Sequence, residues 1–485
     1  MQPQAHAETD VTVGPSFPLG GQEAPSLSEC LISLCARPID VAATGQAQRL
    51  LLDWFGNSLA AINEDGAIEI RQAIQALAGR GSTPTGPCTA FAVGDLPADQ
   101  ATFVNGSLGT LLEMDDLHRA SIMHAGDVVI PAALASAQLS HASGRQLAEG
   151  IVLGYEVALR IGQAAASAGY VAWYNSAICG VFGAAMAAAH AAGASNLVRR
   201  DALGQAGMMA SGLWQCRLEP TDSKPVATAH AARAGVTAAV LAQHGVRGAR
   251  HILDGPLGFF ASYYPNARQD DVLHGVERDW LIHDVSFKPW PACRHVHPAM
   301  GLAIDLREKL EIDQIARIEI TTYAAAIEFC DQPDPQTPHD ARFSLQHCVA
   351  VALTQGNLGT PDTSQQVLAD PRVAALRSKT HIIEAPDLTA AFPRKMGAAL
   401  AITAQDGTLH KAAADDAPGD PEHPLDAAAL SQKLHSNLAS VGIAKAHATQ
   451  LEHCINDLTV QTTLDDLTAA LRNVSHPLQK GQTHD

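Results

Sequence analysis

Between Leu31 and about His283, apolar residues recur every three or four positions, which places them on one face of an α-helix. Gly, Pro and Asp residues separate these segments, as is typical of helix ends. We therefore expect residues 25–283 to form one all-helical domain. Its clearest predicted helices span residues 47–61, 67–79, 99–114, 128–140 and 180–192.

The pattern changes after Val285. Residues 315–323 (IARIEITTY) alternate apolar and polar positions, which is typical of a half-buried strand. Residues 398–403 and 408–412 form a second strand pair, joined across Gln405-Asp406-Gly407, a sequence that favours a hairpin turn. We therefore predict an α+β domain over residues 284–417, and a fold that is mainly α with this smaller α+β second domain.

The two ends of the chain have different compositions. Residues 1–24 are rich in Pro, Gly and Gln, so we expect a flexible tail. A Pro- and Asp-rich stretch over residues 416–424 is interpreted as a linker. Helical periodicity returns after it, and residues 418–485 are predicted to rejoin the helical domain.

Composition and charge narrow the classes of function. The 485 residues exceed what one ordinary core accommodates, which agrees with two folded units. A net charge of −18 disfavours nucleic acids and anionic membranes as partners. The nine cysteines are scattered without a C-x-x-C spacing, and the longest apolar run, residues 177–189, is too short to span a bilayer. We expect a cytoplasmic protein with reduced thiols.

Residues 104–131 contain the least ordinary side chains. In a helix, Val104, Leu108, Leu111 and Leu112 would share one stripe, which Asp115 continues. Burying a charge without a partner is costly, so Asp115 should cap a helix, pair with a cation or act in function. Nearby lie further acids and imidazoles, namely Glu113, Asp116, His118 and His124.

Three interpretations of this cluster stay open. In the first, the cluster is a solvated helix end and the chain is a non-enzymatic helical scaffold. In the second, Asp115, Asp116, His118 and His124 form a metal site, as in a metal-dependent hydrolase. In the third, the cluster is a general acid/base site in which a carboxylate orients His124.

A resemblance to a known family bears on this choice. Asn105-Gly106, the run Leu112–His118 (LEMDDLH) and His124 followed by Gly126 are similar to the signature of the MmgE/PrpD family. The resemblance extends over nearly the whole chain from residue 30. Its further motifs are residues 180–185 (GVFGAA), Ser223-Lys224, 255–259 (GPLGF), 287–291 (FKPWP), 342–346 (RFSLQ) and 418–421 (PGDP).

The resemblance implies a lyase, without metal or other cofactor, that acts on a small polycarboxylic acid. It implies a large helical domain, an α+β lid, an active site between them and usually a homodimer. Members include 2-methylcitrate dehydratase, cis-aconitate decarboxylase and an iminodisuccinate epimerase. We expect dehydration through a carbanion, with decarboxylation or epimerisation as alternatives.

By position, Glu113 takes the place of a family aspartate, and His124, Lys224 and Lys288 match a histidine and two lysines of the family. Tyr174 stands where many members have His. Similarly, His347 stands where many have Tyr.

The resemblance suggests a role for each of these groups. Lys224 and Lys288 would hold substrate carboxylates, with help from Arg294 or His295. His124 would transfer a proton, oriented by Asp116 or Glu113. Tyr174 or His347 would serve the opposite step.

Overall fold

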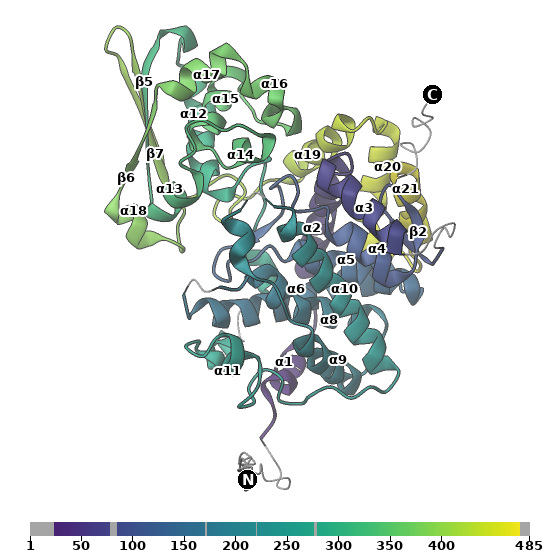
Figure 1. Ribbon diagram of the computed structural model, residues 1–485. Coiled ribbons are helices and arrows are strands. Elements are labelled where there is room, and N and C mark those ends of the chain that lie inside the picture. Colours follow the sequence, from purple (N-terminus) through teal and green to yellow (C-terminus); the bar gives the residue numbers. More distant parts are fainter. Residues whose placement is uncertain (1–23, 78–84, 170–171, 220, 276–278, 476–485) are drawn as a thin grey trace, which may run out of the picture.

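The computed structural model describes residues 24–77, 85–169, 172–219, 221–275 and 279–475. Figure 1 shows a large helical body and, beside it, a smaller body that contains a four-stranded sheet. The predicted fold class, mainly α with an α+β second domain, is confirmed. The predicted tail lies outside the described residues except for Ala24.

The first helix of the helical body is capped by Ser26. Its hydroxyl accepts from the Glu29 amide while the Glu29 carboxylate accepts from the Ser26 amide, which together form a capping box for α1. The body then contains α1 (Leu27–Cys35), α2 (Val41–Ala60), α3 (Asp65–Leu77), α4 (Ala98–Gly106), α5 (Gly126–Leu139), α6 (Gly144–Ala166), α7 (Asn175–Ile178), α8 (Gly180–Ala191), α9 (Asn196–Met208), α10 (Ser223–Gln243) and α11 (Phe259–Tyr263).

Small residues let the central helices α6 and α8 approach closely (Figure 1). A Cβ atom at Gly183 would lie 2.4 Å from the Gly154 carbonyl oxygen, so the two backbones are in direct contact. The alanine-rich composition therefore serves helix packing rather than chemistry.

The last helices, α19 (Ala427–Ser440), α20 (Lys445–Asn456) and α21 (Asp465–Ser475), pack on the helical body near α2 (Figure 1). Leu434 of α19 approaches Gly56 of α2, where a Cβ atom would lie 3.3 Å from the Leu434 Cα. Beside this contact, the buried Lys433 ammonium donates to Asp53 Oδ1 at 2.7 Å and to the Met114 carbonyl at 3.2 Å. The end of the chain thus supports the loop after α4.

The smaller body contains the sheet β6–β5–β7–β8. β5 (Ile315–Thr322) pairs in parallel with β6 (Thr380–Glu384) and antiparallel with β7 (Ala398–Ala404), and β7 continues into β8 (Leu409–Ala414). The strands predicted from alternation and the turn at Gly407, whose φ is 87°, are confirmed. Its helices are α12 (His297–Arg307), α13 (Ala324–Cys330), α14 (Pro338–Arg342), α15 (Leu345–Gln355), α16 (Gln365–Leu368), α17 (Pro371–Ser378) and α18 (Pro386–Ala391).

One predicted helix is wrong in its extent. The pattern over residues 99–114 predicts a single helix, but α4 ends at Gly106 and turns follow to residue 113. Glu113 adopts a φ of 53°, which a right-handed helix cannot contain. Leu108, Leu112 and Asp115 are nevertheless buried, because the turns fold back into the core.

Two short strand pairs tie loops together. β1 (Cys88–Ala90) pairs with β2 (Gly94–Leu96), and β3 (Leu117–His118) pairs with β4 (Val285–Ser286). The second pair joins the loop after α4 to the segment that enters the smaller body. The predicted linker packs on that segment, since the Phe287 amide donates to the Gly419 carbonyl at 2.8 Å.

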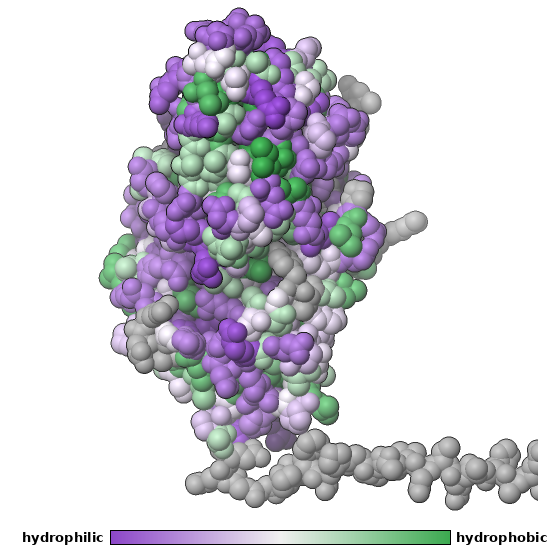
Figure 2. All heavy atoms as spheres, turned by 90° about the vertical axis from the view of Figure 1, so that its left-hand side faces the viewer, coloured by the Kyte–Doolittle hydropathy of each residue, from purple (hydrophilic) through white to green (hydrophobic). Residues whose placement is uncertain are grey.

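The face on the sheet side is mostly hydrophilic, with apolar residues in small separate groups (Figure 2). Across the described ranges, no helix has both the length and the apolar character that crossing a bilayer would require.

The pair Asp53–Lys433 gives a test of how the chain's end stabilises the fold. Lys433→Met leaves a buried carboxylate without its cation, so we expect it to lower the free energy of unfolding by about 3–5 kcal/mol. Urea unfolding followed by circular dichroism measures this loss. Lys445→Met, at an exposed position, is the matched control. Adding Asp53→Leu to Lys433→Met should recover much of the loss; no recovery would contradict the pairing.

Candidate active site

A cavity of about 100 Å³ lies between the two bodies. It brings together Glu113 and His124 from the loop between α4 and α5, Lys224 from the start of α10 and Lys288 from the segment after β4. The other lining residues are Leu117, Arg119, Ile122, Trp214, Cys293, Arg294, His295, Phe329, Phe343, Phe392, Pro393 and Met396.

The Asp115 carboxylate lies beneath this cavity and is fully buried. Its Oδ1 accepts from the Lys288 ammonium at 2.9 Å, and its Oδ2 lies 3.0 Å from His124 Nδ1. Burial would raise the pKa of Asp115, but the charges of His124 and Lys288 outweigh it and hold that pKa well below the ordinary value. Asp115 is therefore a permanent anion between two candidate catalytic groups.

Glu113 forms the second ion pair of the site, with the Lys224 ammonium. Its other oxygen lies 3.6 Å from Lys288 Nζ, and its carbonyl accepts from that ammonium at 3.1 Å. Burial opposes the charge on Glu113, but the two lysines outweigh burial and lower its pKa. The left-handed conformation of Glu113, which costs on the order of 1 kcal/mol, turns this side chain toward both lysines.

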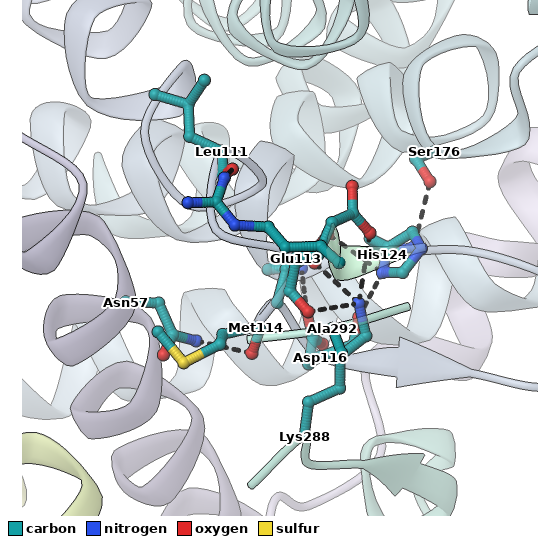
Figure 3. A network of polar contacts seen from close by, with 12 residues as sticks. Asn57, Leu111, Glu113, Met114, Asp116, His124, Ser176, Lys288 and Ala292 are labelled. Atoms are coloured by element: carbon teal, nitrogen blue, oxygen red, sulfur yellow. Dashed lines mark hydrogen bonds and ion pairs between the residues drawn. The ribbon is translucent and has the colours of Figure 1, made fainter. Parts of the chain in front are cut away.

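The hydrogen bonds of His124 fix its tautomer (Figure 3). Nδ1 lies 2.7 Å from the Asp116 carbonyl oxygen, and because a carbonyl only accepts, Nδ1 carries the proton. The backbone amide of His124 donates to the Ser176 hydroxyl at 3.0 Å. Nε2 is then the ring nitrogen left to take up a proton in the cavity. Asp116 or Glu113 was predicted to orient His124; in the structure Asp116 contacts the ring through its backbone carbonyl, and the neighbouring carboxylate is that of Asp115.

Asp116 instead stabilises the loop between α4 and α5. Its carboxyl group accepts from the Tyr155 hydroxyl at 2.9 Å and from the Gly126 amide at 3.0 Å. Burial raises the pKa of Asp116 to about 7. It lies too deep to line the cavity.

Sequence reasoning missed a further acid, Asp127 in the first turn of α5. It is fully buried, and neither of its oxygens has a hydrogen-bond donor in the described part of the chain. Burial, together with the charges of Asp115 and Asp116, raises the pKa of Asp127 well above the ordinary value. Burial thus favours the protonated form of Asp127, which in that form can donate to Asp115.

Arg294 lines the cavity but has another partner. Its guanidinium pairs with Asp420 at 2.5 Å and donates to the Pro418 and Ala417 carbonyls at 3.0 and 3.3 Å. The prediction that Arg294 binds a substrate carboxylate is at odds with this geometry, because its charge is neutralised by the segment around Asp420.

His295 also lines the cavity, as a neutral group. Its Nδ1 lies 2.7 Å from the Tyr323 hydroxyl, and its ring packs 4.9 Å from that of Phe329. Burial, and then repulsion from Lys288, lower the pKa of His295 to about 3. His295 can therefore help to hold a substrate carboxylate through a hydrogen bond but not through a positive charge.

The two positions that depart from the family pattern lie in different places. Tyr174 stacks on Trp214 with ring centroids 4.4 Å apart, and its buried hydroxyl has no hydrogen-bond partner among the described residues. His347 lies in the core of the smaller body, 3.4 Å from Arg377, and does not line the cavity. Neither residue lines the cavity, but Tyr174 stacks on Trp214, which does.

The predicted metal ligands do not converge. His118 Nδ1 lies 2.8 Å from the Ser121 hydroxyl, and burial lowers the pKa of His118 to about 3. In the part of the chain that the structure describes, the acids that do gather are Asp416, Asp420 and Glu422. Arg119 lies between them, at 3.3, 3.8 and 2.6 Å, and neutralises their charge.

Known proteins resemble the chain along most of its length. The model of the MmgE/PrpD N-terminal domain matches residues 26–270, and that of the C-terminal domain matches residues 290–457. Cis-aconitate decarboxylase of Mus musculus is 29% identical over 363 residues, which cover 71% of this chain and 73% of the relative. The mitochondrial 2-methylcitrate dehydratase of Yarrowia lipolytica is 30% identical, over 43% of this chain and 42% of the relative. The resemblance that the motifs indicated is confirmed, and the chain belongs to the MmgE/PrpD family.

Proposed function

We propose that this chain is a lyase that acts on a small polycarboxylic acid by dehydration, through a carbanion intermediate and without a cofactor. The observation that carries the proposal is the placement of the buried Lys288 and the half-buried Lys224 at the same cavity as His124, whose Nδ1 is held by the Asp116 carbonyl. Relatives named as a decarboxylase and a dehydratase, both lyases, support this class of reaction. That the protein is a homodimer, and that it is located in the cytoplasm, both remain predictions.

In the proposed reaction, His124 Nε2 takes a proton from the carbon next to a substrate carboxylate. The electron pair moves into an enolate-like dianion, whose charge Lys224 and Lys288 stabilise. It then forms the C=C bond as the β-hydroxyl leaves with a proton from the Tyr174 hydroxyl. The products are an alkene and water, and the proton held by His124 returns to Tyr174 through solvent.

Decarboxylation is the second candidate. The curated relatives that cover the larger share of the chain are named cis-aconitate decarboxylases, from Mus musculus and Homo sapiens. In that reaction the C–C bond to the departing CO₂ breaks, and a protonated His124 delivers its proton to the carbanion. Both reactions share the carbanion and its stabilising lysines, as does epimerisation, so the same variants test all three.

The first test is an NMR time course in D₂O with chelator-treated enzyme and citrate, 2-methylcitrate, cis-aconitate or iminodisuccinate. We expect a new alkene, or deuterium on carbon, from one of these acids.

His124→Ala should lower kcat by roughly 10²–10⁴-fold, and Lys288→Met should abolish measurable turnover. His230→Ala, at a half-buried histidine on α10, is the control that should retain activity. Turnover that appears only after a divalent metal is restored would overturn the cofactor-free proposal.

The second test concerns Asp127 as a positioning residue for Asp115. Asp127→Asn keeps an N–H donor toward Asp115, so we expect a kcat within about threefold of the wild type. Asp127→Leu leaves Asp115 without that donor, a loss of roughly 1–3 kcal/mol, and should lower kcat about 10- to 100-fold with little change in KM. Equal kcat values for both variants, with only the melting temperature reduced, would show that Asp127 is purely structural.

A further inference from the structure

We propose that Cys293 and Cys330 form an oxidation site at the wall of the cavity, where a small hydroperoxide converts the two thiols reversibly into a disulfide. The site shares the cavity with the proposed reaction but does not depend on which reaction the cavity performs. The place of the two thiols in the fold and the different surroundings of their sulfur atoms support the proposal.

The two thiols meet where the cavity borders the core of the smaller body. Cys293 lines the cavity and is 8% exposed, whereas Cys330, the last residue of α13, is fully buried. Both belong to the apolar core of the smaller body, and the Cys330 thiol donates a hydrogen bond to the Cys293 sulfur. A small oxidant in the cavity therefore reaches Cys293 first, and Cys330 stands directly behind it.

The surroundings of Cys293 favour its thiolate. Its pKa is lowered, first by the hydrogen bond from the Cys330 thiol and then by the charge of Lys288 and the backbone amide of His295. Burial and the charge of Glu113 oppose this shift but do not cancel it. Because the thiolate rather than the thiol attacks an oxidant, Cys293 is the sulfur that reacts first.

Other buried cysteines lack these surroundings. Burial raises the pKa of Cys35, Cys88 and Cys179 to about 12, which keeps them as unreactive thiols. Burial also raises the pKa of Cys330 well above the ordinary value. Cys330 thus keeps its proton until Cys293 has been oxidised.

A metal site is a weaker interpretation of these cysteines. A third thiol of the same core, that of Cys348, donates to the Ala341 carbonyl at 3.3 Å. Within the described residues, the sulfur atoms of Cys293, Cys330 and Cys348 do not lie close enough together to share one metal ion. Two sulfur atoms in contact at a cavity wall favour dithiol chemistry instead.

The proposed oxidation takes two steps. In the first, the Cys293 thiolate attacks one oxygen of hydrogen peroxide and the O–O bond breaks. This gives a sulfenic acid and hydroxide, which takes up the proton that Cys293 released. In the second, the Cys330 sulfur attacks the Cys293 sulfur, the S–O bond breaks, and hydroxide leaves as water with the Cys330 proton. The disulfide removes a thiol from beside Lys288, so oxidation changes the cavity itself.

Peroxide treatment of the folded, fully reduced protein tests the site without relying on turnover. After exposure to hydrogen peroxide, free thiols are blocked with N-ethylmaleimide and the peptides are identified by mass spectrometry. We expect an intramolecular cross-link between Cys293 and Cys330, a loss of two of the nine thiols, and their return with dithiothreitol. Cys293 that stays reduced, pairs with another cysteine or ends as a sulfinic acid without a cross-link would overturn the proposal.

A variant of the second thiol separates the two steps. Cys330→Ala keeps an apolar side chain, so Cys293 should stop at the sulfenic acid, which dimedone labels far more than in the wild type. Cys454→Ala is the matched control and should cross-link like the wild type. Cys454 is also 8% exposed, but its charged neighbours in the described part of the chain are Asp457 and Asp466 rather than a thiol. Equal labelling of Cys330→Ala and the wild type would contradict the role of Cys330. The wild-type cross-link decides the proposal even if Cys330→Ala does not fold.

Discussion

The buried carboxylate of Asp115 is the constraint on which the rest of the site depends. A charge with no exposure to water is tolerated only when cations and donors surround it. Lys288 and His124 supply that surrounding, and each is thereby held in place by the same interaction that stabilises Asp115. Positioning of these candidate catalytic groups and compensation of the buried charge are therefore one interaction.

Holding Lys288 beside Asp115 requires both bodies. The antiparallel pairing of β3 with β4 places the segment before Lys288 next to the loop after α4. On its other side, Asp420 accepts from Ser286 at 2.6 Å, and the Gly419 carbonyl accepts from Phe287. A Cβ atom at Gly419 would lie 2.1 Å from the Phe287 carbonyl oxygen, so only glycine fits this approach. The segment predicted as a linker thus fixes the junction between the bodies.

Local pattern predicted the helices and strands but only part of the site. Periodicity identifies β5 and most helices because burial repeats along them, yet it cannot foresee the left-handed Glu113, which depends on contacts with distant residues. The partners of Lys224 and Lys288 lie 111 and 173 positions away, so only family resemblance pointed to those lysines. The pairing of Arg294 with Asp420 was not foreseen for the same reason, since the two are far apart in sequence.

Because Lys224 and Glu113 neutralise each other, a substrate carboxylate that enters the cavity adds a net negative charge to a site of low dielectric. The site can accept it only if Lys224 turns from Glu113 toward the substrate or if Glu113 takes up a proton. Lys288 differs, because its ammonium donates both to the Asp115 carboxylate, at 2.9 Å, and to the Glu113 carbonyl, at 3.1 Å. Lys224 is half-buried whereas Lys288 is fully buried, so we expect the Glu113–Lys224 pair, rather than Lys288, to rearrange when a substrate binds.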